Sequence, residues 1–504
     1  MQVNRKFPTS RLVLSFGSLV ILILASGNTP SFTPIHQARL KTLGPENSNQ
    51  RSLITEYPLN QSQAYPLGLA VDSRGNLWFG ETNSDAIIEF LPQSQSFRSF
   101  HIPVSPQLVW VWTPVFDNNG NLWFTTTNGS VIWRLNPSNG QFANFSTGNP
   151  TTIPYNLAFD SVSNTIWFVS LNSSQFGDFR LNGNGAQIQS IYDIPTNGPG
   201  PIGSSDIALD QQGNVYIADS FVGQILKFST ADGSLEHVYT LPKGSQPLGL
   251  AIDQATDAIW FTNHGSSFFG YVNQTSGVVT EFSTSTITFK GSYEVTLPYW
   301  IQISSSGMIW FNEHIGNKIA RFDPSNYELT EFSVPTPSSE PIKFILDNQR
   351  GLVWFSEFTG NKIGMLEQNS SLQSNLFLSS QKLTLSGNSV SLTASTSSNG
   401  SLVFSSTASI TGEIGDNFTI STSAQGSSQS ITINRGSSLQ DGTYQLTICT
   451  SSASPLRTCR IAFINVKKQS SFFSQYEIEI AIAAIAVTLG LSLYFVLKWN
   501  RRAS

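Results

Sequence analysis

A pattern that repeats about every 45 residues limits what this chain can fold into. Each copy has Pro-x-Gly, a short apolar segment ending in Asp, a turn with Gly, and an aromatic that opens the next segment, as in residues 66–81 (PLGLAVDSRGNLWFGE). That aromatic recurs as Trp78, Trp123, Trp167, Tyr216, Trp260, Trp310 and Trp354. Seven copies, each with four short strands, predict a seven-bladed β-propeller over residues 52–371 rather than a helical solenoid.

The repeated aromatic and acidic residues have structural interpretations. A four-stranded sheet has two apolar faces and buries both only by stacking on its neighbours, so we interpret the repeated Trp-Phe pairs as core rather than as ligand contacts. The Asp that ends the first segment is placed to accept hydrogen bonds from turn amides. This interpretation applies to Asp72, Asp117, Asp160, Asp210, Asp253 and Asp347.

The last copy lacks a strand of its own. It supplies Phe344–Leu346, Val353–Glu357 and Ile363–Glu367, which make three strands. The missing fourth is predicted at Ser52–Leu59, because its LITEYP resembles LTEFSVP at the end of the sixth copy. A strand from the N-terminal side that completes the last blade closes the ring and protects a sheet edge.

The repeat ends near residue 371. Residues 372–468 are rich in Ser and Thr with alternating apolar positions, which predicts a small Ig-like β-sandwich that acts as a stalk. Cys449 and Cys459 flank a turn and, in an exported protein, would form one disulfide. The predicted fold class is therefore all-β, with a propeller followed by a sandwich and one membrane helix.

Both ends of the chain carry membrane-related patterns. Residues 1–27 read as a signal peptide, with an uncleaved anchor as the alternative, and residues 28–51 as a linker. An apolar helix at 476–497, before the basic tail 498–504, predicts a single-pass protein of the cell membrane with the propeller extracellular. Asn-x-Ser/Thr triplets, which permit glycosylation, occur at Asn60, Asn128, Asn144, Asn172, Asn273, Asn369, Asn399 and Asn417.

Two copies carry a motif that resembles a known family. Residues 310–319 (WFNEHIGNKI) and 354–363 (WFSEFTGNKI) are similar to the repeats of the virginiamycin B lyase family, over roughly residues 52–370. The resemblance implies a propeller enzyme that opens a cyclic depsipeptide by elimination, with a bound magnesium ion and a histidine base. The family's Glu-Pro-His-Gly site corresponds here to Glu340-Pro341-Ile342-Lys343.

The resemblance assigns roles at this site. Glu340 and Glu357 match the family's two metal carboxylates, so Mg²⁺ is the implied cofactor. Ile342 stands at the position of the catalytic histidine and accepts no proton, which leaves the elimination without its base. Lys343 would serve instead only if burial lowered its pKa.

Residues near the start of the innermost strands predict a ligand face at the channel mouth. Two copies are unusually aromatic there, and Trp110 adds to them; packing between loops is the alternative interpretation. The candidate ligand contacts are Trp112, Tyr155, Asp206, His264, Tyr299, Trp300, Glu313 and His314. No two of the five histidines have the sequence spacing of a zinc site.

Two functions from different classes remain open. The first is a membrane-anchored module that binds an extracellular ligand, glycan, peptide or protein partner at the channel mouth. The second is a metal-dependent lyase; a structural component of the cell envelope is a third possibility. A net charge of −5 gives no basic field, so nucleic acid is not expected as a partner.

Overall fold

The computed structural model describes residues 53–467, apart from 105–109, 127–128, 171–172, 184, 196–202, 285–295, 371–375, 397–401, 408–417, 426–427, 436–439 and 451–455. The predicted signal peptide 1–27, linker 28–51, membrane helix 476–497 and tail 498–504 lie outside the described residues. Within the described ranges no helix has the length and apolar character of a membrane span. The chain divides into two compact units: Met1–Ser374 with Thr450–Cys459, and Asn375–Cys449 with Arg460–Ser504.

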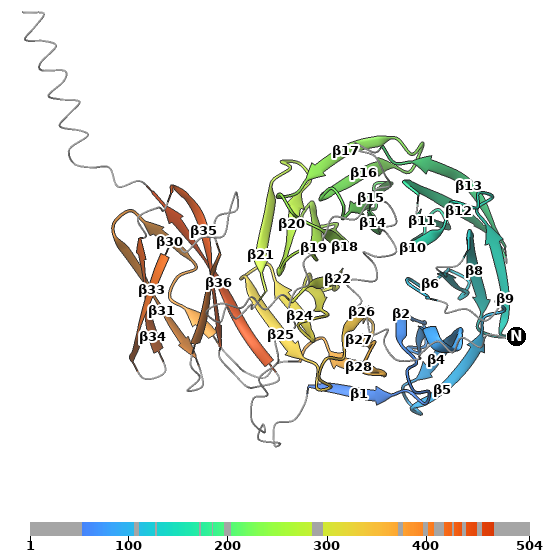
Figure 1. The fold of residues 1–504 in the computed structure, drawn as a ribbon, viewed down its shortest axis with the longest axis horizontal. Coiled ribbons are helices and arrows are strands. Elements are labelled where there is room, and N and C mark those ends of the chain that lie inside the picture. The colour runs from blue at the N-terminus through green and yellow to red at the C-terminus, as the bar shows by residue number, and fades with distance from the viewer. Residues whose placement is uncertain are drawn as a thin grey trace, which may run out of the picture. The chain divides into compact units, whose positions relative to one another are not determined.

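The first unit is a ring of antiparallel four-stranded sheets, the blades of the propeller (Figure 1). The first strand of each blade lies nearest the centre of the ring and the last lies outside. The first three blades are β2 (Pro66–Val71), β3 (Leu77–Glu81), β4 (Ala86–Leu91) and β5 (Ser96–His101); β6 (Val115–Phe116), β7 (Leu122–Thr125), β8 (Val131–Asn136) and β9 (Gln141–Ser146); and β10 (Pro154–Asp160), β11 (Thr165–Ser170), β12 (Gln175–Asn182) and β13 (Gly185–Asp193). A short helix, η1 (Thr82–Ser84), follows β3.

Four further blades complete the ring. They are β14 (Ser204–Leu209), β15 (Asn214–Asp219), β16 (Gln224–Ser229) and β17 (Leu235–Thr240); β18 (Pro247–Asp253), β19 (Ala258–Asn263), β20 (Phe268–Asn273) and β21 (Val279–Ser283); β22 (Pro298–Ile303), β23 (Ile309–Glu313), β24 (Lys318–Asp323) and β25 (Glu328–Ser333); and β26 (Pro341–Asp347), β27 (Leu352–Glu357), β28 (Lys362–Glu367) and β1 (Ile54–Pro58). Seven blades among the described residues agree with the seven copies of the repeat.

The ring is closed by the N-terminal strand. β1 pairs antiparallel with β28, from Ile54 opposite Leu366 to Pro58 opposite Lys362. The predicted closure is therefore confirmed. Ile54 is buried in one cluster with Trp310 and Phe332 of the sixth blade, so this strand also contributes to an interface between blades.

The repeated aromatics form the interfaces between blades, as predicted. Trp78, Trp123, Trp310 and Trp354 are among the largest fully buried side chains. Trp354 of the last blade meets Phe90 of the first edge to face, with ring centroids 5.9 Å apart. Each such aromatic buries roughly 150–250 Å², which makes these contacts a major source of propeller stability.

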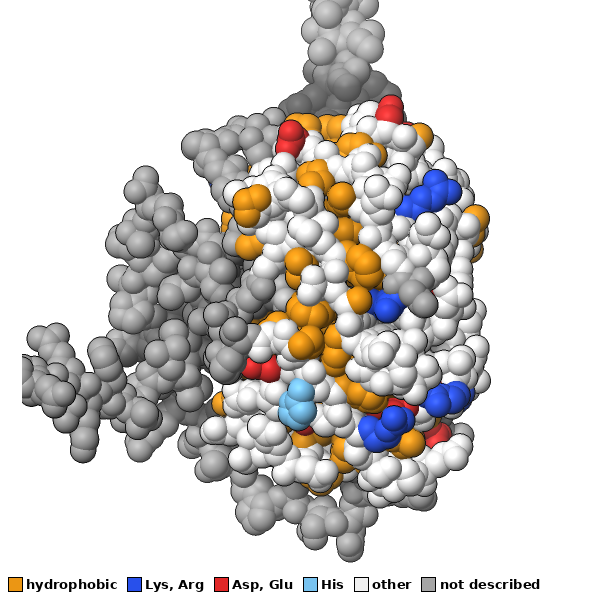
Figure 2. All heavy atoms as spheres, turned by 90° about the vertical axis from the view of Figure 1, so that its right-hand side faces the viewer, with side chains coloured by type: hydrophobic (Ala, Val, Ile, Leu, Met, Phe, Trp, Pro, Cys, Tyr) orange, Lys and Arg blue, Asp and Glu red, His pale blue; other side chains and the backbone are white. Residues whose placement is uncertain are grey.

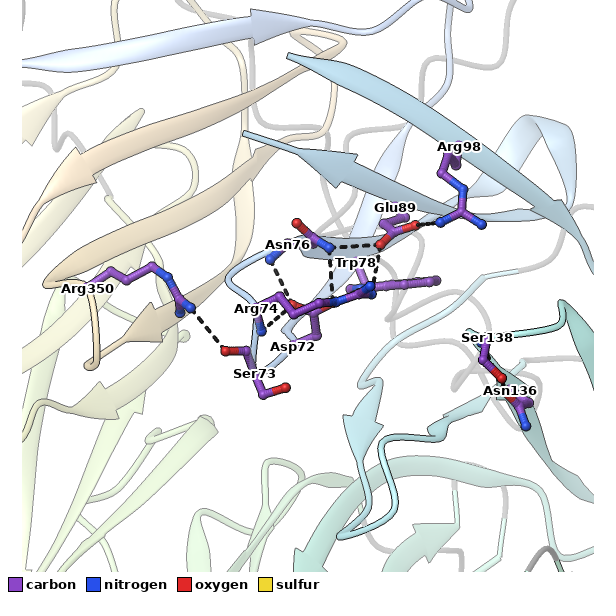
Figure 3. A network of polar contacts seen from close by, with 10 residues as sticks. All are labelled: Asp72, Ser73, Arg74, Asn76, Trp78, Glu89, Arg98, Asn136, Ser138 and Arg350. Atoms are coloured by element: carbon purple, nitrogen blue, oxygen red, sulfur yellow. Dashed lines mark hydrogen bonds and ion pairs between the residues drawn. The ribbon is translucent and has the colours of Figure 1, made fainter. Parts of the chain in front are cut away.

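The repeated aspartates fasten the first hairpin of a blade (Figure 3). Asp72 Oδ1 accepts hydrogen bonds of 2.9 Å from the backbone N–H groups of Arg74 and Asn76. The indole Nε1–H of Trp78 donates to Asp72 Oδ2 at 3.3 Å, so the turn also fixes the core aromatic. Asp117 repeats this arrangement with Trp123, at 2.8 Å. The predicted turn role is therefore confirmed at these positions.

Charged side chains near the first hairpin turns join neighbouring strands and blades. Glu89, on the third strand of the first blade, is 0% exposed and accepts hydrogen bonds from Asn76 and Arg98 (Figure 3). Arg350 of the last blade donates to the backbone oxygen of Ser73 in the first blade, at 3.0 Å. This bond links the two blades between which the ring closes.

One side of the propeller's outer edge carries few charges. Figure 2 shows the side on which β9 and β13 lie, where hydrophobic side chains form a narrow band and charged ones stand apart. This view agrees with a composition of only 12% charged residues. This side of the ring is thus mostly neutral and polar.

The second unit contains two sheets around one hydrophobic core. One sheet has the order β29 (Leu376–Leu378), β31 (Ser389–Thr396), β34 (Ser428–Arg435) and β33 (Phe418–Gln425); the other contains β36 (Leu456–Val466), β35 (Gly442–Thr450), β32 (Leu402–Thr407) and, parallel to β36, β30 (Lys382–Leu385). Ala394 of the first sheet and Ile448 of the second lie in the same buried cluster. Cys449 and Cys459 are disulfide-bonded.

Candidate functional site

The candidate residues gather at one end of the ring, here called the upper face. Because the strands of each blade alternate in direction, every first strand begins at this end and every second strand ends there. The inner strands bring Tyr155, Asp206, Tyr299 and Trp300 there, and the loops that follow β19 and β23 bring the two histidines.

The aromatic residues at the channel mouth are buried rather than open. Trp112, Tyr155 and Tyr299 are at most 8% exposed and pack in one cluster with Ile342, which is 1% exposed. Trp112 meets Tyr155 edge to face, with centroids 5.0 Å apart. The packing interpretation therefore accounts for these three rings, and their role as ligand contacts stays a prediction. Trp110 and Trp300 are only partly buried.

Lys343 and Asp206 form a buried pair of ionisable side chains that interact electrostatically. Lys343 and Asp206 are each 3% exposed, and Lys343 Nζ lies 3.0 Å from the ring centre of Trp300. Burial lowers the pKa of Lys343, opposed by the charge of Asp206, and burial raises the pKa of Asp206, opposed by the charge of Lys343. Asp206 also accepts a 2.8 Å hydrogen bond from the backbone of Leu250. The sequence alone gave no indication that Lys343 is buried.

Two cavities flank this pair. The smaller, of about 30 Å³, holds about one water molecule and is lined by residues that include Tyr155, Tyr299 and Lys343. The larger, of about 290 Å³, is lined by residues that include Asp206 and Gln302. Trp300 lines both. A large substrate therefore cannot reach Lys343 through the smaller cavity unless the aromatic cluster moves.

The two carboxylates that match the family's metal ligands have raised pKa values. Burial raises the pKa of Glu340, and burial together with the charge of Glu56 raises that of Glu357 to about 8, although Lys362 opposes the rise. No three His, Cys, Asp or Glu side chains converge within the described parts of the chain. Mg²⁺ prefers oxygen ligands, so two carboxylates with water molecules in the other coordination positions suit it. The ammonium group of Lys362, however, already interacts with Glu357 and would compete with the ion.

Glu313 of the sixth blade lies in a group of ion-paired side chains, and the last blade contains a similar group. Glu313 is 0% exposed, and its Oε2 is 3.6 Å from Lys318 Nζ, which is 2.7 Å from Glu331 Oε2. In the last blade Lys362 Nζ pairs in the same way with Glu56 Oε2, at 2.6 Å. The repeated motif thus places a lysine beside carboxylates in both blades. For Glu313, predicted as a ligand contact, the structure shows this internal ion pair.

The asparagine of the same motif joins blades, a role that our sequence reasoning missed. Asn317 has a φ of 54° and accepts hydrogen bonds from the backbone N–H and the hydroxyl of Ser339. Asn361, with a φ of 56°, accepts a 2.7 Å bond from the N–H of Ala64 and donates to the oxygen of Gln61. Asn tolerates this left-handed backbone better than most residues, so the repeated Gly-Asn-Lys-Ile was the available signal.

The two predicted histidines lie together. His264 and His314 are 50 positions apart in the sequence, yet their Nε2 atoms are 3.3 Å apart. Tyr299 contacts both rings, stacked on His314 at 5.7 Å and edge-on to His264 at 5.6 Å. Burial lowers the pKa of His264 to about 4 and that of His314 to about 3, so both rings are neutral at pH 7.

Exposed apolar side chains also occur on the upper face, and sequence reasoning did not single them out. Phe221 and Val222, in the loop after β15, are 49% and 59% exposed, and Ile315, in the loop after β23, is 47% exposed. Large apolar side chains left in water are candidates for ligand contact.

Comparison with known proteins places this fold and site in context. The model of the virginiamycin B lyase family matches residues 52–348, more than half of the chain. A selenomethionine-substituted virginiamycin B lyase from Staphylococcus aureus is 22% identical, with a TM-score of 0.54, over 62% of this chain and 98% of that one. A streptogramin B lyase structure is 24% identical, with a TM-score of 0.53, over 62% and 96%.

A third solved structure is a catalytically inactive histidine-to-alanine variant of the Staphylococcus aureus enzyme with quinupristin. It is 23% identical, with a TM-score of 0.54, over 62% of this chain and 98% of that one. Identities this low establish the shared fold alone. A comparison with curated protein sequences gives no match.

Proposed function

Because the chain belongs to the virginiamycin B lyase family, we propose that it uses the family's propeller to bind a ligand or partner at the upper face, without the family's elimination chemistry. The observation that carries this proposal is Ile342. The resemblance places the family's catalytic histidine at this position, and the isoleucine there is 1% exposed within an apolar cluster. An alkyl side chain takes no proton from a substrate.

Exposed groups on the upper face support binding there. Phe221, Val222 and Ile315 present apolar surface, and Trp110 and Trp300 are partly exposed beside the buried cluster. The chain has only 12% charged residues and a net charge of −5, which suits a glycan or an extended peptide more than a nucleic acid.

A library of soluble glycans and peptides, screened against the full chain, tests this proposal. Phe221→Ser and Ile315→Ser should each weaken any binding detected by about tenfold, since each removes roughly 1–2 kcal/mol of apolar contact. Val162→Ser is the matched control, because Val162 is 95% exposed in the turn between β10 and β11 at the opposite end of the ring. Equal affinity in all three variants would place binding elsewhere.

The metal-dependent lyase is the second candidate, favoured by Glu340, Glu357 and the burial of Lys343. A lysine with a lowered pKa is able to act as a general base at neutral pH. Mg²⁺ at the two carboxylates would supply electrostatic stabilisation of developing negative charge. The enclosed position of Lys343 weighs against this candidate.

Incubation with quinupristin and Mg²⁺, followed by mass spectrometry, separates the two candidates. We expect no linear product from the wild type; linear product that disappears in Lys343→Met would establish the lyase with Lys343 as its base. Product formed only by Ile342→His would show that the catalytic base is the one group missing from the wild-type site. Calorimetry with Mg²⁺ on the wild type and on Glu357→Gln tests the metal separately.

The cellular location is part of the same proposal and rests on the sequence alone. We propose that residues 1–27 direct export and that the helix at 476–497 holds the propeller outside the cell membrane. Deletion of residues 476–504 should release the chain into the medium. The full chain, in contrast, should stay with the membrane fraction. Protease added to intact cells should digest the propeller; complete protection would contradict this topology.

A further inference from the structure

We propose that His264 and His314 form a binding site for a transition-metal ion such as Zn²⁺ or Cu²⁺ on the upper face. This site is separate from the magnesium position that the family resemblance implies at Glu340 and Glu357. It goes beyond the proposed function, because it does not depend on which ligand the propeller recognises.

The distance between the two rings carries the proposal. Two imidazole nitrogens that bind one tetrahedral Zn²⁺ at about 2.0–2.1 Å lie about 3.3–3.4 Å apart. The two Nε2 atoms are 3.3 Å apart. An N–H···N hydrogen bond between them is the alternative, although 3.3 Å is long beside the roughly 2.9–3.0 Å that is most common for N–H···O bonds. The observed separation is thus closer to that of two ligands on one ion.

The fold places both rings by the same local geometry. Each histidine is the first residue after the second strand of its blade, β19 or β23, and the two blades are neighbours in the chain. The same position holds Thr82, Thr127, Leu171, Ser220 and Phe358 in the other copies. Histidine therefore occurs only in two adjacent copies, where the side chains meet.

The surroundings hold the rings in place. The backbone N–H of His264 donates to Gln246 at 2.9 Å, and the backbone oxygen of His314 accepts from Asn317. Tyr299 lies against both rings, and its own backbone oxygen accepts a 2.6 Å bond from Thr262. Rings fixed in this way need little reorganisation to bind a metal.

The donor set selects the class of metal. Neutral imidazoles suit Zn²⁺, Cu²⁺ and Ni²⁺, whereas Mg²⁺ and Ca²⁺ prefer oxygen ligands. Within the described residues no third His, Cys, Asp or Glu joins the pair, so the remaining coordination positions fall to water or to an incoming ligand. His264 is only partly buried, which leaves a route from solvent.

Calorimetric titration of the full chain with Zn²⁺, in a buffer that does not bind the metal, tests the site. We expect about one equivalent to bind, and His264→Ala and His314→Ala each to weaken binding by about tenfold or more. His237→Ala is the matched control, because His237 is exposed on the outer strand β17 and should leave the affinity unchanged. No saturable binding, or the same affinity in both site variants, overturns the proposal.

A spectroscopic measurement keeps the test independent of variant folding. Cu²⁺ added to the wild type should give an electron paramagnetic resonance spectrum with nitrogen splitting from two imidazoles, and excess Mg²⁺ should not displace it. A spectrum without such splitting overturns the site. If an alanine variant unfolds, as judged by thermal denaturation, His264→Gln and His314→Gln give the comparison.

Discussion

Lys362 Nζ lies 2.6 Å from Glu56 Oε2, so an ion pair joins the last blade to the strand that closes the ring, 306 positions earlier in the chain. Thr336, which leads into the last blade, also donates its backbone N–H to Glu56, at 2.8 Å. One carboxylate thus connects three segments. The equivalent group in the sixth blade, Lys318 with Glu331, is built within a single continuous copy.

Glu56→Gln should destabilise the propeller in a pH-dependent way. Burial alone would raise the pKa of Glu56, but hydrogen bonds from Lys362 and Thr336 outweigh it and lower the pKa below 4.5. Because the folded pKa lies below the unfolded one, the contribution is present above about pH 4.5 and is lost as the pH falls through the folded pKa. Chemical denaturation at pH 7 should show a loss of about 1 kcal/mol. Glu236→Gln, in a surface pair with Lys227, should change stability by less than about 0.5 kcal/mol.

Asn361→Ala should weaken ring closure more than Asn361→Gly. Both variants lose the hydrogen bonds to Ala64 and Gln61, but only alanine also opposes the left-handed backbone, at a cost of about 1–2 kcal/mol. We expect the alanine variant to lose about 2–3 kcal/mol of unfolding free energy and the glycine variant about 1 kcal/mol less. Denaturant titration measures both. Two variants as stable as the wild type would show that these bonds contribute nothing.

Glu357→Gln should stabilise the protein in alkaline solution. Burial raises the pKa of Glu357 to about 8, so its folded pKa exceeds the unfolded value of 4.5. The stability that its protonated form contributes is complete below pH 4.5 and is lost as the pH rises through about 8. Thermal denaturation at pH 9 should therefore give a Tm on the order of 2–4 °C above wild type, with little difference at pH 4. Glu367→Gln, exposed on the same blade, should follow the wild-type pH profile.

Asp117→Ala should cost more stability than Asp253→Ala. Asp117 is 6% exposed and accepts hydrogen bonds from two backbone N–H groups, from Asn121 Nδ2 and from Trp123 Nε1. Asp253 accepts bonds from Ala255 and Thr256 at an exposed turn. We expect losses of about 3 and 1 kcal/mol respectively, measured by denaturant titration. Equal losses would show that the bond to the core tryptophan adds nothing.

Much of the fold was predictable because its pattern is local and repeats. The spacing of Trp78, Trp123 and Trp167 gave the blades, and the similarity between residues 52–59 and the end of the sixth copy gave the closing strand. The turn aspartates were also predictable, since their partners lie within six residues. Such features depend on neighbours along the chain, which the sequence displays directly.

The candidate site was only partly predictable, because exposure depends on what packs above each side chain. Trp112 and Tyr299 stand at the mouth as expected, but the ring brings them together with Ile342 and excludes water. The acidic residue that interacts with Lys343 is Asp206, which lies 137 positions earlier in the chain and comes from another blade.

The sequence by itself determined a seven-fold repeat of four-stranded blades, its closure and its family, because periodicity and motifs are properties of the chain alone. Only the tertiary structure decided which mouth residues are buried and that His264 and His314 meet. Sequence spacing indicated no zinc site, since the two histidines are 50 positions apart. Equivalent positions in adjacent blades become neighbours only when the blades stack into a ring, and that contact creates both the aromatic cluster and the histidine pair.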